Sequence, residues 1–317
     1  MIRFLHSLTG AHLPERPRGV EESTMDNNTT SKATTKDSVT GSCLAIIRQA
    51  IAEPGLIHEA YSRFHGYSLR NQLLAMIQCV QRGIMPCPLA TYPGWERLGR
   101  HVMRGQKTLV LCVPITQAQP ETDDDAVREP ADDASRVFFV YRSRWFVLSQ
   151  TDGDAYDPVD VPAWSEERAL KHLGIKIVPF DHLDGNVQGY ATPEGNVAIN
   201  PVAGLRHKTL FHELAHIILG HAKDETVSRS VREVEAEGVA LFCCEALGLE
   251  GSVYARGYLQ HWLGREALTE VSAQRIISTA HRILAAGVRR NLLIPLPGDA
   301  AFARIMQEKR VWCFLSR

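Results

Sequence analysis

The chain has 317 residues, of which 44% are hydrophobic and 22% are charged, and its formal net charge at pH 7 is -1. That length leaves room for two ordinary globular domains, and so balanced a charge favours no class of partner. No run of 18 apolar residues occurs, which excludes a transmembrane helix, and the opening MIRFLHSLTG lacks the apolar core of a signal peptide.

The seven cysteines are odd in number and form no C-x2-C pairs. This pattern is untypical of a secreted disulfide framework and favours reduced thiols, so we expect a cytoplasmic protein without a membrane partner.

Residues 1–37 are polar, rich in Ser and Thr, and without an apolar period, which predicts a disordered tail. Met25 offers an alternative translation start to Met1. A first domain is predicted from residue 38 to residue 150. Its expected elements are an amphipathic helix over 42–53, a second helix that begins after Ser68 and stops at Gly83, and a short helix near 94–99.

Two apolar runs, 108–115 and 137–151, are typical of strands, and they flank an acidic stretch. Residues 121–133 carry seven acidic residues against one Arg, which predicts a solvated loop over 119–134 at the tip of a long hairpin.

Residues 151–164, rich in Pro and Asp, are predicted to be a linker to a second domain over 165–290. Ser165 is placed to cap a short helix, three short strands follow up to residue 201, and the rest is expected to be helical. A long helix should cover 205–221, another 232–247 before Gly248, and two more the stretch from 252 to 286. Residues 291–317 form a C-terminal extension.

The motif His-Glu-Leu-Ala-His at 212–216 carries the chemistry. Two histidines at i and i+4 lie on one face of a helix and can reach one metal ion, and Glu213 can then act as general base on a water molecule. Because the flanking residues are mostly apolar, the motif should be buried, and buried His and Glu side chains are costly unless they bind something. The motif therefore predicts His212 and His216 as ligands.

A catalytic zinc site needs a third protein ligand, and the following helix offers Glu233, Glu235 and Glu237. At about 100° per residue, Glu235 falls in the middle of the apolar face, whereas Glu233 and Glu237 share with Arg229 the face that is expected to be solvated. We therefore predict Glu235 as the third ligand, with Glu237 in reserve. Two histidines and one carboxylate favour Zn2+, with Mn2+ as the alternative. Expected oxyanion donors are His221, Tyr190 and His207.

From residue 38 to residue 110 there are eight Lys plus Arg against three acidic residues, interleaved with aromatic side chains. Cations track phosphates and rings stack on bases, so this composition suits single-stranded nucleic acid, although a solvated basic face over an aromatic core would look the same.

Both halves resemble known families. The stretches FHGYSLRNQLLAMIQC, YPGWERLGRHVMRGQKTLVLCVPI and FFVYRSRWFVLSQTDG resemble the N-terminal single-stranded-DNA-binding domain of ArdC-type antirestriction proteins. HELAHIILGH followed by REVEAEGVALFCCEALGL resembles the ImmA/IrrE-type metallopeptidase domain, which is found joined to it. The resemblance covers about residues 40–285. ImmA/IrrE members often have Asn where this chain has Glu237, which leaves open which Glu is the ligand.

The resemblance implies an α+β protein of two domains: an α/β domain that binds single-stranded DNA, and a mainly helical zincin-like metallopeptidase domain with a small sheet. The enzyme would be a gluzincin-like zinc metalloendopeptidase acting on a protein or peptide substrate. Two other hypotheses remain: a non-catalytic DNA-binding protein with a structural or regulatory metal site, and a peptidase that cleaves a transcriptional repressor. The residues predicted to contact DNA, from charge and position, are Arg70, Asn71, Trp95, Arg100, Arg104 and Lys107.

Overall fold

The computed structural model describes residues 42–116, 137–181, 186–224, 226–263 and 268–288. The predicted tail, acidic loop and C-terminal extension lie outside these residues. The N-terminal half contains α1 (Cys43–Ala52), α2 (Leu56–Arg63), α3 (Leu69–Arg82), β1 (Leu89–Thr91), α4 (Tyr92–Arg97), β2 (Arg100–Val102), β3 (Leu109–Thr116), β4 (Val137–Val147) and β5 (Thr151–Gly153). The C-terminal half contains α5 (Glu166–Leu173), β6 (Ile177–Val178), β7 (Gly189–Ala191), β8 (Val197–Ile199), α6 (Arg206–Ile218), α7 (Arg229–Ala246), α8 (Ser252–Leu263) and α9 (Glu270–Gly287).

Local signals place most of these helices. The Ser42 hydroxyl accepts a hydrogen bond from the Ala45 N–H at the start of α1, and Ser165 does the same for Arg168 in α5. Gly83 ends α3 in the left-handed conformation, with φ of 63°, as its position after the apolar stripe predicts. The sequence pattern does not predict α2, because Pro54-Gly55 indicates only the end of the preceding helix.

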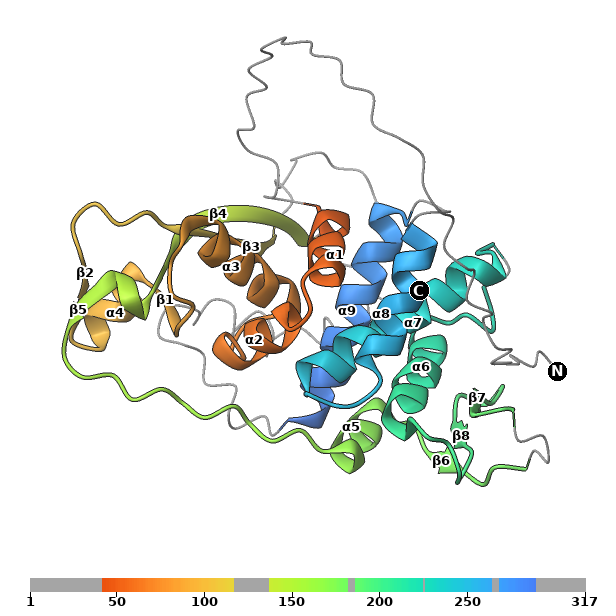
Figure 1. Cartoon of the computed structure of the whole chain (residues 1–317). Helices are drawn as coiled ribbons and strands as arrows, with labels where there is room; N and C mark the ends of the chain where they lie inside the picture. Colours follow the sequence, from red (N-terminus) through yellow and green to blue (C-terminus); the bar gives the residue numbers. More distant parts are fainter. Residues whose placement is uncertain (1–41, 117–136, 182–185, 225, 264–267, 289–317) are drawn as a thin grey trace, which may run out of the picture.

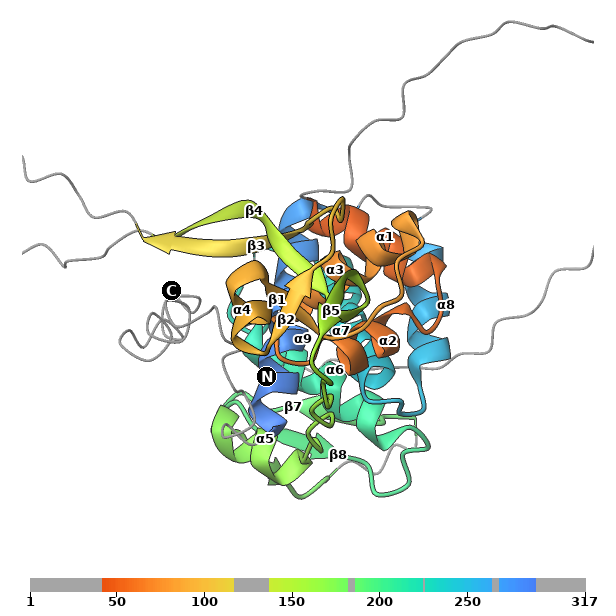
Figure 2. The same ribbon diagram turned by 90° about the vertical axis from the view of Figure 1, so that its left-hand side faces the viewer.

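The predicted hairpin is confirmed. β3 pairs antiparallel with β4 from Leu109–Trp145 to Thr116–Val137, and β1 lines the other edge of β4. Figure 2 shows the β3–β4 ribbon reaching away from the helices. A separate two-stranded pairing joins β2 to β5.

The C-terminal half has a small sheet in the order β6-β8-β7, in which β6 runs parallel and β7 antiparallel to β8. The helix α6 packs against β7 and β8, and α7 packs against α6, α8 and α9. Mixed helices and small sheets agree with the α+β class. None of the helices within the described ranges is long and apolar enough to span a membrane.

One hydrophobic core serves both halves. Buried residues of α1–α3 and β3 belong to the same cluster as those of α6–α9, and Figure 1 shows α1–α3 beside α7–α9. A second, small cluster surrounds Trp95, with Ala90 and Phe146. The predicted linker over 151–164 begins with β5, and the chain then crosses to α5 without helix or strand over 154–165. The hydrophobic core does not divide there.

Candidate metal centre

The helix α6 holds the two histidines of the motif. His212 and His216 are buried, and their Nε2 atoms lie 3.1 Å apart. The neighbouring Leu210, Phe211, Leu214 and Ala215 are fully buried, as the apolar flanks of the motif predict. Both imidazole rings therefore face the same position between α6 and α7.

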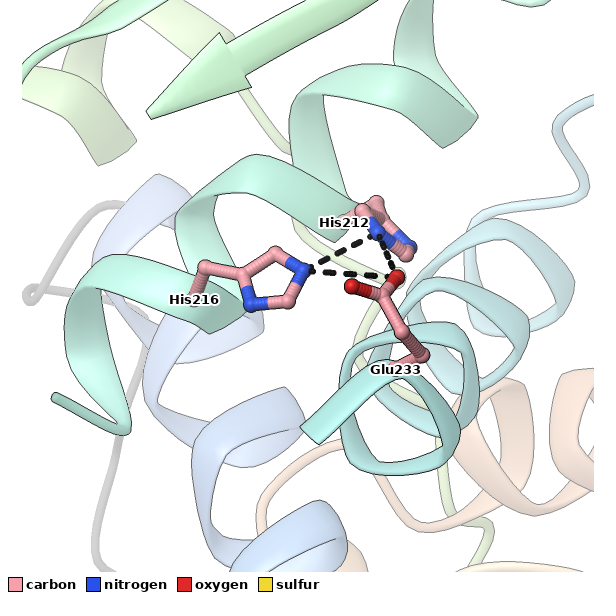
Figure 3. Close-up of side chains that lie close together, drawn as sticks. All are labelled: His212, His216 and Glu233. Atoms are coloured by element: carbon pink, nitrogen blue, oxygen red, sulfur yellow. Dashed lines mark hydrogen bonds and ion pairs between the residues drawn. The ribbon is translucent and has the colours of Figure 1, made fainter. Parts of the chain in front are cut away.

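A carboxylate from the first part of α7 completes the group. Glu233 Oε2 lies 3.4 Å from His212 Nε2 and 3.8 Å from His216 Nε2 (Figure 3). Among the residues that the structure describes, this is the group of His, Cys, Asp or Glu side chains whose ligand atoms lie within 4.8 Å of one another. A tetrahedral zinc site with bonds of about 2.0–2.1 Å separates its ligand atoms by roughly 3.3 Å. The three distances bracket that value.

Glu235 does not join this group. Its Oε2 lies 3.0 Å from His221 Nε2 and 3.0 Å from Arg275 Nε, so it faces the end of α6 and α9. Residues two apart on a helix point about 160° from each other, which places Glu233 on the far side of α7 from Glu235. The structure therefore differs from the sequence prediction of Glu235 as the third ligand.

The reserve ligand, Glu237, lies behind His212. Its Oε2 is 3.1 Å from His212 Nδ1, and its Oε1 is 2.7 Å from the Lys208 ammonium. The expectation that the face of Glu233 and Glu237 is solvated is wrong for Glu237, which is buried. The reason is that α7 is covered by α6 on this side and by α9 on the other.

These contacts fit a cation. The Glu237 carboxylate can only accept, so His212 donates through Nδ1, and its Nε2 is left as the ring atom that can bind a cation beside Glu233 and His216. Burial lowers the pKa of His212, but the carboxylates of Glu233 and Glu237 outweigh this and raise it to about 9. The position between the imidazoles therefore attracts positive charge, and imidazole nitrogens with a carboxylate are the ligands that zinc prefers.

Glu213 lies next to this group as a buried carboxylate. Burial raises its pKa to about 7, against the lowering effect of His212. The backbone N–H of Ala191 in β7 bonds to the carboxylate, while Oε2 has no hydrogen-bond partner among the described residues. A carboxylate in this state can take up and release a proton near neutral pH.

The strand β7 is held close to α6 by a glycine. A Cβ at Gly189 would lie 2.6 Å from Thr209 Cγ2 and 3.6 Å from Glu213 Cγ, so residue 189 faces α6. Side chains alternate along a strand, which puts Tyr190 on the opposite face, where its hydroxyl bonds to Asp181. His207 lies 3.6 Å from Glu166, and His221 lies between His216 and Glu235. The three donors expected for an oxyanion are thus engaged elsewhere.

Four of the residues predicted to contact DNA make contacts within the fold. The Asn71 amide bonds to both backbone groups of Cys112, and the buried Trp95 donates to the Phe146 carbonyl. Arg70 bonds to Tyr141 and lies over its ring, and Arg100 bonds to Thr151.

The other two predicted DNA contacts, Arg104 and Lys107, are exposed in the turn between β2 and β3. Sequence reasoning missed three exposed side chains on β4: Phe139, Arg142 and Arg144. The spacing of Arg142 and Arg144, two residues apart along a strand, is the signal that could have found the two arginines.

Comparison with known proteins finds similarity to antirestriction proteins. Two solved crystal structures of the antirestriction ArdC protein from the R388 plasmid are similar to the chain. The metal-free one is 17% identical, with 80% of this chain and 97% of that chain covered and a TM-score of 0.42. The Mn(II)-bound one is 15% identical, with 78% and 98% covered and a TM-score of 0.44. No curated protein matches the sequence. Residues 48–146 match the family model of the N-terminal domain of the anti-restriction factor ArdC, which supports an ArdC-type N-terminal region in this chain.

Proposed function

We propose that this protein is an ArdC-type antirestriction protein with two activities. Its N-terminal region binds single-stranded DNA, and its α6–α7 site binds one divalent metal ion and hydrolyses peptide bonds. Zinc is the proposed ion and manganese the alternative. The observation that carries the proposal is the convergence of His212 Nε2, His216 Nε2 and Glu233 Oε2. Beside them lies Glu213, whose Oε2 has no hydrogen-bond partner in the part of the chain that the structure describes.

When bound there, a zinc ion supplies a Lewis acid that lowers the pKa of a water molecule and polarises a carbonyl. The chain's own residues do the rest. Glu213 takes the proton of the attacking water at its carboxylate and returns it to the leaving amine. The Ala191 N–H fixes the position of that carboxylate, and Glu237 holds the ring of His212 through its Nδ1 proton.

Glu233, rather than Glu235, is the third ligand in this proposal. The choice rests on distance, because Glu235 is held by His221 and Arg275 on the other side of α7. A ligand atom must lie about 2 Å from the metal ion, and only a carboxylate on the side of α7 that faces α6 can come so close.

The DNA-binding part of the proposal rests on the family match over residues 48–146 and on the exposed cations of this region. Arg104, Lys107, Arg142 and Arg144 are exposed, and Phe139 offers an exposed ring on the same ribbon. Cations and rings together suit a single strand, whose phosphates and bases they contact.

Metal content of the purified protein tests the metal site. Wild type should hold about one equivalent of zinc or manganese, and His212→Ala and Glu233→Ala should hold none. Glu213→Gln and the exposed control Glu59→Ala should keep the metal. Loss from Glu235→Ala together with retention by Glu233→Ala would return Glu235 to the ligand set, and a wild type that takes up neither ion would overturn the site.

Peptide hydrolysis is tested with Glu213→Gln against wild type on a mixture of unfolded proteins. Cleavage by wild type that Glu213→Gln abolishes, with metal retained, supports the peptidase. Equal behaviour of both proteins favours instead the non-catalytic alternative, in which the metal site is structural.

A further inference from the structure

A third imidazole lies directly behind one of the proposed ligands. His221 is fully buried, its Nδ1 is 2.8 Å from His216 Nδ1, and its Nε2 is 3.0 Å from Glu235 Oε2. The three side chains form a line that ends at the group of His212, His216 and Glu233. This line uses a histidine and a glutamate that the proposed reaction does not involve.

Three elements hold His221 in this place. It follows the end of α6, and its backbone N–H donates to the His216 carbonyl at 3.0 Å. The guanidinium of Arg232 in α7 donates to the His221 carbonyl at 2.8 Å. Arg275 of α9 donates to the Leu219 carbonyl at 3.2 Å and to Glu235 at 3.0 Å. The turn and the carboxylate are therefore fixed relative to each other.

Donor and acceptor rules then assign the protons. An ionised carboxylate can only accept, so His221 donates to Glu235 through Nε2. A neutral His221 leaves Nδ1 as an acceptor, which requires His216 to donate through its own Nδ1. The lone pair of His216 then lies on Nε2, the atom that faces His212 and Glu233. The reverse order would place a proton on the atom that faces the metal position.

We propose that His221 and Glu235 are positioning residues that fix the tautomer and orientation of His216 as a metal ligand. This inference rests on the proposed metal site. His212 is oriented in the same way but without an intervening imidazole. Glu237 accepts a hydrogen bond directly from its Nδ1 and is itself held by Lys208. A carboxylate in direct contact thus orients His212, whereas the carboxylate of Glu235 orients His216 through the imidazole of His221.

The dissociation constant for zinc, measured by competition with a chromophoric chelator, tests the role. Loss of an outer hydrogen-bond partner weakens metal binding by about 10- to 100-fold. Glu235→Gln and His221→Phe should each weaken zinc binding by that factor. Glu235 acts on His216 only through His221. The double variant Glu235→Gln with His221→Phe should therefore bind zinc as tightly as the single variant with the lower zinc affinity. Glu235→Gln combined with Glu237→Gln should instead multiply the two losses, because the arms are separate.

The proton positions are tested in wild type without metal, by nitrogen-15 spectra of the histidine rings. His216 should carry the proton on Nδ1 and a lone pair on Nε2, and in His221→Phe it should lose this preference. A His216 protonated on Nε2 in wild type would overturn the inference, and so would unchanged zinc affinity in Glu235→Gln and His221→Phe. A wild type that binds no zinc would instead overturn the proposed metal site.

Discussion

Glu245 in α7 and Arg256 in α8 form a buried ion pair that ties α1 and α2 to the C-terminal helices. Glu245 Oε1 accepts from the backbone N–H groups of Gly55 and Ile57, at 2.8 and 3.3 Å, where α2 begins. Arg256 donates to the Ala50 and Ile51 carbonyls, at 2.6 and 2.5 Å, where α1 ends. The pair therefore provides hydrogen-bond partners for the free carbonyls at the end of α1 and the free N–H groups at the start of α2, which lie far away in the sequence.

Replacement of Glu245 by Gln should lower the free energy of unfolding by about 3–5 kcal/mol, because it leaves the buried Arg256 without its counter-charge. Urea unfolding followed by circular dichroism measures this. The exposed Glu59, paired with Arg63 at 3.4 Å, is the matched control, and Glu59→Gln should cost less than about 0.5 kcal/mol. Similar losses from both variants would contradict a special role for the buried pair.

Gly189→Ala should destabilise the protein by about 1–3 kcal/mol through overpacking between β7 and α6. The added methyl would meet Thr209 Cγ2 at 2.6 Å and the Ala198 carbonyl at 3.0 Å. Thr209→Ser removes that Cγ2, so the double variant should regain part of the melting temperature. Gly204→Ala is the control, because a Cβ there would meet nothing within 4 Å, and it should leave the melting temperature nearly unchanged.

Stability should fall as the pH is lowered from about 6.5 to about 4 because of His281. Burial lowers the pKa of this residue from 6.5 to about 4, and its Nδ1 accepts from the Leu69 N–H. Between these values the unfolded chain binds a proton that the folded chain does not, so acid favours unfolding by up to about 3 kcal/mol. Chemical unfolding of wild type and His281→Gln at several pH values isolates the effect. Parallel curves for the two proteins would contradict it.

Arg104→Ala with Lys107→Ala should weaken binding to a single-stranded oligonucleotide. The slope of log K against log salt should become shallower by about 0.7 for each phosphate that the variant no longer binds, and the melting temperature should not change. Fluorescence anisotropy across a salt series measures both affinity and slope.

Asn71→Ala is the contrasting variant. It removes the two bonds to the Cys112 backbone, so it should cost about 1–3 kcal/mol of stability and leave the salt slope as in wild type. A shallower slope for Asn71→Ala would support the sequence prediction that this residue contacts DNA.

Features that depend on local chemistry are predictable from residue spacing. An interval of four residues places His212 and His216 on one face of a helix, whatever the rest of the chain does. Ser165 caps α5 through a group three residues away, and apolar runs typical of strands predict β3 and β4. These interactions close within one turn or one hairpin, so the amino-acid order alone reveals them.

Which carboxylate faces the histidines depends instead on how the helices pack. Periodicity identifies the apolar face of a helix that has one solvated side, but α7 is covered by α6, α8 and α9, and Glu235 and Glu237 are buried on opposite sides. The start of α2, the roles of Asn71 and Trp95, and the union of both halves in one core depend likewise on partners far away in the sequence, such as Glu245, which lies 190 residues from Gly55. Such contacts are determined by tertiary packing, so residue spacing along the chain does not predict them.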